Sequence, residues 1–185
     1  MTKQQGFTLI EIIVAIAIIA IIPAIVIPNF PQARLQFALS RTAYSFAKDV
    51  RRAQAMALSA VPYTDSLGAS QPISGYGIQI NLASGSGLGN KKYIIYADKQ
   101  PGNAEYDTAD YTVGTYETES GIVIKEIQNV VGSSASINFA PPKPDTTIIS
   151  LASGQTAITV VFAFENDPSR TKTVSINLSG LIEVK

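Results

Sequence analysis

The chain of 185 residues contains no cysteine, no histidine and no tryptophan. Without cysteine, a domain outside the cytoplasm must hold together through its core alone, because neither disulfides nor thiolate metal sites can form. The joint absence of histidine and cysteine also removes Ser-His and Cys-His nucleophile pairs and the usual zinc ligands. Only carboxylate or lysine chemistry would remain for an enzyme, and no motif supports it. We therefore expect a protein that is not an enzyme.

Charge is balanced overall but divided unevenly along the chain. Between Asn29 and Leu58 five basic residues stand against one acid, a net of +4. From Ser59 to Lys185 eight basic residues stand against twelve acids, a net of −4. A basic segment followed by an acidic domain suits side-by-side assembly, because complementary potentials favour register between neighbours. The alternative, an ordinary solvated helix face, stays open at this point.

One long apolar run, from Phe7 to Ile27, follows a polar leader in which Lys3 is the only charged side chain. Its 21 residues, at a rise of about 1.5 Å each, span about 30 Å, the thickness of one hydrocarbon core. The run carries a single acid, Glu11. A carboxylate at the bilayer centre costs roughly 3 kcal/mol on insertion scales, so it calls for a function and a partner. Cleavage after Gly6 would free the amine of Phe7 as that partner, four residues before Glu11 on the same helix face.

Two simpler interpretations compete. An ordinary secretory signal has a shorter apolar core and a small-x-small cleavage site, whereas Ile22 stands where a small residue would be required. A plain membrane anchor fits the length of the run. It accounts neither for Glu11 nor for the glycine just before the run.

The sequence Gly6-Phe7-Thr8-Leu9-Ile10-Glu11 resembles the processing site of type IV pilins and of the pseudopilins of type II secretion systems. The resemblance implies that a prepilin peptidase cuts after Gly6 and methylates Phe7, and that Glu11 helps each subunit to dock into a helical filament. It also implies a single pass through the inner membrane and a periplasmic head. The implied partners are other pilin or pseudopilin subunits and the peptidase, with secreted cargo or an outer-membrane secretin as further candidates.

Beyond the apolar run, a helix is predicted over residues 32–58. Apolar side chains recur there in steps of three and four, a pattern typical of an amphipathic helix that buries one face. These positions are Leu35, Leu39, Thr42, Phe46, Val50, Ala53 and Ala57, and the opposite face carries Arg34, Arg41, Ser45, Lys48 and Arg52. Pro28 and Pro31 predict a loosened or kinked helix between the two segments, since proline removes a backbone donor.

The rest of the chain shows the period-two pattern of strands separated by turn residues. Strands are predicted over residues 76–82, 93–97, 122–131, 136–140, 157–165, 171–178 and 181–184. Short turns make successive strands antiparallel. The predicted class is therefore α+β, with a long N-terminal helix packed on an antiparallel β-sheet or a two-sheet β-sandwich head. The predicted domains are a leader (1–6), the long helix (7–58, membrane half 7–27 and amphipathic half 32–58) and the β head (59–185).

Two further segments narrow the resemblance within the family. Residues 41–58 are similar to the helix joining stalk to head in minor subunits related to pseudopilin H and to FimT-type minor pilins. The ending, residues 169–184, is similar to their C-terminal hairpin, whose turn glycine would be Gly180. Glu11 excludes the tip subunit called K, which lacks this glutamate.

Acidic residues cluster between Asp98 and Ser120, where six acids face Lys99 alone. Hard oxygen ligands on a loop are what calcium prefers, and backbone carbonyls can complete six to eight contacts. The candidate ligands are Asp98, Asn103, Asp107 and Asp110, and several relatives in the resembled family bind calcium in a head loop. The spacing is not that of an EF-hand, so a solvated acidic loop is the competing interpretation. A catalytic pair of Asp107 and Asp110 has no pocket to support it.

The sequence thus predicts a minor pilin or pseudopilin that acts by filament assembly. The alternative is a DNA-binding minor pilin of a competence pilus, a role of some FimT-like proteins. That role needs an exposed basic patch to neutralise phosphates. The candidates are Arg170 and Lys172, with Lys143 and Lys185 nearby, but the net acidity of the head argues against nucleic acid.

Overall fold

The computed structural model describes residues 6–26, 30–65, 67–83, 85–141 and 145–185. The chain divides into two compact units, Met1–Phe37 and Ala38–Lys185. We call the second the head unit. Lys3, the segment at Pro28 where a kink was predicted, and Lys143 lie outside the described residues. The sequence-based domain boundaries remain predictions.

The first unit contains helix α1 (Leu9–Val26). Its large apolar side chains are exposed, from 49% for Val14 to 77% for Leu9. Among the described residues of this unit, none covers these side chains, so they are available to another apolar environment.

Helix α2 (Phe30–Leu58) ends at the residue where the sequence pattern predicted an end. A Schellman motif closes it, because Val61 N–H donates to Met56 O (3.2 Å) and Ala60 N–H donates to Ala57 O (3.0 Å). Ala60 takes the left-handed conformation that this motif requires, with φ of 46°. The helix can therefore stop sharply without leaving its last carbonyls unpaired.

The predicted stripe of α2 is buried wherever it lies in the head unit. Leu39, Phe46, Val50 and Ala53 are fully buried, and Ala57 nearly so. The predicted polar face, Arg41, Ser45, Lys48 and Arg52, is exposed.

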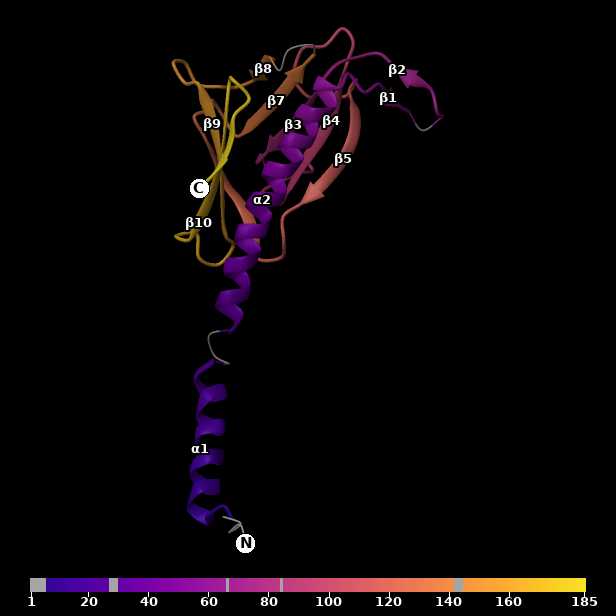
Figure 1. The fold of residues 1–185 in the computed structure, drawn as a ribbon. Helices are drawn as coiled ribbons and strands as arrows, with labels where there is room; N and C mark the ends of the chain where they lie inside the picture. Colours follow the sequence, from indigo (N-terminus) through magenta and orange to yellow (C-terminus); the bar gives the residue numbers. More distant parts are fainter. Residues whose placement is uncertain (1–5, 27–29, 66, 84, 142–144) are drawn as a thin grey trace. The chain divides into compact units, whose positions relative to one another are not determined.

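The described strands of the head unit form three antiparallel sheets, most of whose strands are labelled in Figure 1. The five-stranded sheet has the order β5-β4-β3-β7-β8, with bounds β3 Ile73–Asn81, β4 Lys92–Lys99, β5 Tyr111–Glu117, β7 Ser134–Ala140 and β8 Asp145–Ile148. The four-stranded sheet has the order β11-β10-β9-β6, with bounds β6 Ile122–Gln128, β9 Ala157–Phe164, β10 Thr171–Asn177 and β11 Ile182–Val184. A small ribbon pairs β1 (Tyr63–Thr64) with β2 (Ser70–Gln71).

Helix α2 contacts both larger sheets, and Phe46 lies where they meet. Its ring centroid is 5.0 Å from that of Tyr93 on β4 and 5.4 Å from that of Phe162 on β9. Arg51 on α2 also donates to Ile182 O of β11 (3.2 Å), and Tyr93 OH donates to Asp49 of α2 (2.6 Å). The helix thus joins the two sheets into one core, as its position in front of the strands suggests (Figure 1).

The α+β class, with a helix packed on antiparallel sheets, is confirmed, whereas the sandwich arrangement stays a prediction. Each of the seven predicted strands has a counterpart, although the first strand after residue 120 ends at Gln128 rather than residue 131. Four strands were missed: β1, β2, β5 and β8. The largest correction is β5, because the acidic segment after Asp98 was interpreted as loop throughout. A register shift in the β4–β5 pairing, where Ile95 faces Gly114 and Tyr96 faces Thr112, interrupts the period of two that would have marked it.

Candidate processing and assembly site

The three predicted processing and assembly residues lie at the start of α1. Thr8 immediately precedes the helix, and its backbone N–H and hydroxyl both donate to Glu11 Oε2, each at 2.8 Å. In return, Glu11 N–H donates to Thr8 Oγ1 at 3.4 Å. This reciprocal pattern between the N-cap and the third helical residue is a capping box. It fixes the first turn of the helix directly after Phe7, which is 85% exposed.

The capping box leaves Glu11 with spare acceptor capacity. Both donors from Thr8 reach Oε2, and among the described residues Oε1 has no partner. A carboxylate offers about four lone-pair sites, so Glu11 can accept an amine without giving up its cap. The sequence analysis missed the role of Thr8, although the spacing of threonine and glutamate three residues apart is a known signal for a helix start.

Gly6 has no structural reason to be glycine. A Cβ added at this position would meet nothing within 4 Å, and Gly6 is not among the glycines with positive φ. The local fold would therefore accept another residue here. A requirement for glycine would have to come from outside the folded chain, as recognition by a peptidase would.

Glu11 lies on a shallow apolar groove along one face of α1. The groove is lined by Ile10, Glu11, Val14, Ala15 and Ile18. Among the residues that the structure describes, no helix reaches both the length and the apolarity of a membrane span.

The four candidate calcium ligands, Asp98, Asn103, Asp107 and Asp110, all line one pocket of about 220 Å³ at the loop between β4 and β5. Asp98 is the buried member of the four, with 3% of its surface exposed. Burial raises the pKa of Asp98, and the charges of Asp110 and Asp107 act in the same direction.

Backbone N–H groups already donate hydrogen bonds to several carboxylate oxygens in this pocket. Asp110 accepts from Lys99 N (2.9 Å) and Asp107 N (3.0 Å), while Asp107 accepts from Ala109 N (2.6 Å). Asp98 accepts from Ala104 N at 3.0 Å. Across the described part of the chain, no group of three or more acids is arranged to hold a metal ion. Calcium binding therefore stays a prediction.

The two DNA candidates are close in sequence but have different partners. Arg170 Nε lies 3.8 Å from Asp167 Oδ2. Lys172 Nζ lies over the ring of Tyr44, 5.8 Å from its centroid. The charge of Arg170 is thus already paired with an acid, whereas Lys172 keeps its charge.

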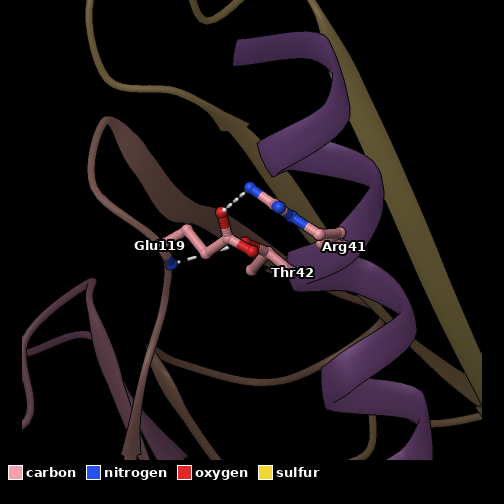
Figure 2. Close-up of polar contacts among 3 residues, drawn as sticks. All are labelled: Arg41, Thr42 and Glu119. Carbon is pink, nitrogen blue, oxygen red and sulfur yellow. Dashed lines mark hydrogen bonds and ion pairs between the residues drawn. The ribbon is translucent and has the colours of Figure 1, made fainter. Parts of the chain in front are cut away.

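The basic residues predicted on α2 are mostly used within the head unit. Arg41 Nη2 lies 2.7 Å from Glu119 Oε2, and Glu119 N–H donates to Thr42 Oγ1 at 3.4 Å (Figure 2). Arg52 donates to Tyr116 OH (2.9 Å), and Arg51 bonds to β11. These three side chains connect α2 to other parts of the head unit, and the side-by-side assembly suggested by the charge division stays a prediction.

Comparison with known proteins gives one match. Residues 1–27 match the family described as the prokaryotic N-terminal methylation motif. No curated protein and no solved structure is significantly similar to the chain. The match supports a type IV pilin-like protein, cleaved by prepilin peptidase and anchored in a membrane through its N-terminal helix. It points to a structural filament subunit rather than an enzyme, and to assembly with other pilin subunits.

Proposed function

We propose that this chain is a minor pilin or pseudopilin. Prepilin peptidase cuts it after Gly6, Phe7 becomes the methylated N-terminus, and the following apolar helix holds it in the inner membrane as a single pass with a periplasmic head. The observation that carries this proposal is the methylation motif over residues 1–27, with Glu11 exposed at the start of α1.

Assembly then proceeds through the first turn of the helix. Thr8 holds Glu11 Oε2 within the subunit, and the free amine of Phe7 from a neighbour meets Oε1. The pairing neutralises two charges that would each be costly in an apolar filament core.

Within the family, the proposed relatives are pseudopilin H and the FimT-type minor pilins of a type II secretion system or pilus-like filament. The geometry of the C-terminal hairpin supports this, since Gly180 occupies the turn between β10 and β11 with φ of +79°. Secreted cargo and the outer-membrane secretin are the proposed further partners of the head.

DNA capture at a competence pilus is the competing function. The pairing of Arg170 with Asp167 reduces the free positive charge. Because non-specific DNA affinity comes almost wholly from phosphate neutralisation, this pairing supports the structural role.

Mass spectrometry of the protein extracted from membranes tests processing. We expect a chain that begins at methylated Phe7. Gly6→Val should block cleavage, because a branched side chain does not fit a peptidase site that accepts glycine, whereas Gln4→Val in the same leader should be processed normally. A chain that keeps Met1, or one cut near Ala24, would refute the proposal.

A second experiment tests the role of Glu11. Glu11→Leu should accumulate in the membrane at normal levels but fail to co-purify with partner subunits, because it removes a costly charge together with the pairing acid. Thr8→Val is the matched control for the cap, since it removes the hydroxyl donor and leaves the acid. Normal assembly of Glu11→Leu would exclude charge pairing as the docking contact.

A further inference from the structure

The five-stranded sheet has two chemically different faces. On the face toward α2, the cross-strand neighbours Ile78, Ile95 and Ile137 are fully buried. Tyr93, two residues before Ile95, contacts Phe46 of the helix on this face. Because side chains alternate along a strand, the residues between these point to the opposite face. That face carries five buried polar side chains, which we call the polar patch: Gln79 on β3, Tyr96 and Asp98 on β4, and Ser136 and Asn138 on β7.

A short segment after β4 lies over the polar patch. It comprises residues 102–106, and we call it the strap. Ala104, at its centre, makes two hydrogen bonds to β4. Its N–H donates to Asp98 Oδ2 at 3.0 Å, and its carbonyl accepts from Tyr96 OH at 2.9 Å. The main chain of the strap is thus bonded directly to two members of the patch.

Both ends of the strap also contact the patch. Tyr106 N–H donates to Ser136 Oγ on β7 at 3.1 Å, and the Tyr106 ring centroid lies 5.3 Å from that of Tyr96. Gly102 lies directly against the patch, because a Cβ added there would collide with Asp98 Oδ2. No residue of the strap is itself buried, whereas the side chains beneath it are. The strap is therefore a cover over the polar patch.

The contacts that hold this cover are mostly polar. Apart from the ring pair of Tyr96 and Tyr106, they are hydrogen bonds. Separation of the strap from the patch would expose little apolar surface, and the freed polar groups can bond to water. Segments with few buried apolar contacts open locally at a smaller free-energy cost than unfolding of the whole domain. The strap can therefore leave the patch while the sheet stays folded.

Asp98 is the member of the patch whose charge changes between acidic and neutral pH. Its Oδ2 also accepts from Asn138 Nδ2 at 3.2 Å, so one carboxyl group joins the strap to β4 and β7. Burial raises the pKa of Asp98, and the charges of Asp110 and Asp107 act in the same direction. Burial also raises the pKa of Tyr96, so the Tyr96 hydroxyl stays neutral in this range.

No described cation compensates the charge of Asp98. β7 has no ionisable residue, and that of β3, Tyr76, lies on the other face and donates to Val61 O. Lys99 holds its Nζ over the ring of Tyr111, 5.8 Å from the centroid. The remaining ionisable groups of the segment are acids or a tyrosine: Glu105, Tyr106, Asp107 and Asp110. An ionised Asp98 under the closed strap is thus a buried charge without a cation, which is unfavourable.

We propose that the strap is a pH-sensitive cover, which lies closed while Asp98 is protonated and opens when Asp98 loses its proton. The closed strap binds this proton more tightly than the open strap, because only the closed strap keeps the carboxyl group from water. Protonation therefore favours closure fully below the usual pKa of 3.8, and this preference is lost as pH rises through the pKa of the closed state. Opening uncovers the amide and hydroxyl groups of Gln79, Ser136 and Asn138. The cover does not depend on the proposed function, since it needs only the head unit.

The absence of tryptophan from the chain permits a direct test in the full-length protein in detergent. Tyr106→Trp keeps the backbone N–H that bonds to Ser136 and an aromatic ring beside Tyr96. Quenching of its fluorescence by acrylamide measures how far the strap is open. We expect the quenching constant to rise several-fold between about pH 4 and about pH 8. The matched control is Tyr116→Trp, also half-buried but on β5 outside the strap, whose quenching should stay constant.

Two substitutions in the Tyr106→Trp protein test whether Asp98 is the group that titrates. Asp98→Asn should keep quenching low at every pH, because the asparagine oxygen can accept from Ala104 N–H and carries no charge. Asp110→Asn should move the rise to lower pH, since the charge of Asp110 raises the pKa of Asp98. Asp110 lies outside the strap, and asparagine there keeps an oxygen that can accept from Lys99 N–H.

Three results would overturn the proposal. One is quenching of Tyr106→Trp that does not change with pH. Another is an equal rise in Tyr116→Trp, which would mean unfolding of the whole domain. The third is a rise that persists in Asp98→Asn. If Asp98→Asn does not fold, Asp110→Asn decides, because a rise at an unchanged pH would exclude Asp98 as the switch.

Discussion

Substitution of Gly180 tests whether the C-terminal hairpin is docked on α2. Gly180 has φ of +79°, and its carbonyl accepts a hydrogen bond from Gln54 Nε2 at 3.2 Å. A Cβ added there would lie 2.6 Å from Gln54 Nε2 and 3.2 Å from Thr146 Oγ1. Gly180→Ala must therefore both strain the backbone and displace Gln54.

The two effects can be estimated separately. A left-handed conformation costs a residue other than glycine about 1 to 2 kcal/mol. Loss of the Gln54 bond costs about 0.5 to 1.5 kcal/mol more. The matched control is Gly154→Ala, because Gly154 has φ of +78° but a Cβ there would meet nothing within 4 Å. We expect Gly180→Ala to lower the free energy of unfolding by about 1 kcal/mol more than Gly154→Ala, the worth of one hydrogen bond.

Urea unfolding of residues 32–185 provides the measurement. A third variant, Gln54→Ala with Gly180→Ala, should lose less than the sum of the two single changes, since the clash and the lost bond involve the same pair. Equal losses for Gly180→Ala and Gly154→Ala, or strict additivity with Gln54→Ala, would refute the docking of the hairpin on α2.

Three further expectations concern the same fragment. Residues 32–185 should be soluble and unfold cooperatively without sensitivity to reductant, because the buried stripe of α2 packs on its own sheets; a broad, non-cooperative transition would mean that the stripe packs mainly on other subunits. Millimolar calcium should leave the melting temperature unchanged, since backbone donors already occupy the pocket carboxylates and a ligand stabilises only the state that binds it; a rise that disappears in Asp107→Asn would establish the calcium site instead. Folding raises the pKa of Asp98 above its usual 3.8, so the folded protein binds the proton of Asp98 more tightly than the unfolded chain does. The contribution of Asp98 to stability therefore falls as pH rises from about 3.8 through the pKa of the folded state. Asp98→Asn should remove that fall from the pH dependence of urea unfolding, and an unchanged pH profile would contradict it.

The features that the sequence predicted best are those governed by local periodicity. The apolar steps of α2 follow one helical face, and that face is buried from Leu39 to Ala57. Strand β9 could also be predicted from local sequence, because its run of apolar residues from Ala157 is bounded by turn residues.

The features that were missed depend on tertiary context. In β5 the larger apolar and aromatic residues are Tyr111, Val113 and Tyr116, so the alternation of two is lost after Val113, at the register shift opposite Ile95. Its place in the sheet comes from pairing with β4, which periodicity within β5 cannot reveal. The partners of Arg41, Arg51 and Arg52 come from residues far along the chain, so helical spacing alone could not show that these side chains contact the protein's own head unit.

The candidate site also has a part that the sequence predicted and a part that it did not. The identity of Gly6, Phe7 and Glu11 could be proposed from local spacing, because a cleavage motif is a linear signal. The capping box adds what spacing alone did not suggest, namely that Thr8 engages one oxygen of Glu11 before any partner is present.

This division of the Glu11 oxygens bears on how an acid can serve in an apolar helix. An unpaired carboxylate in hydrocarbon is costly, and its cost is reduced when fixed donors accompany it. Thr8 supplies two such donors from the same chain, so Glu11 never depends entirely on a neighbour. In the proposed assembly, a neighbour's amine would bind Oε1, which has no partner among the described residues, and would add an ionic contact rather than replace the cap. Under this proposal, an acid held in this way is tolerable in a single subunit and becomes favourable beside the amine of another subunit, which is the condition that filament assembly would require.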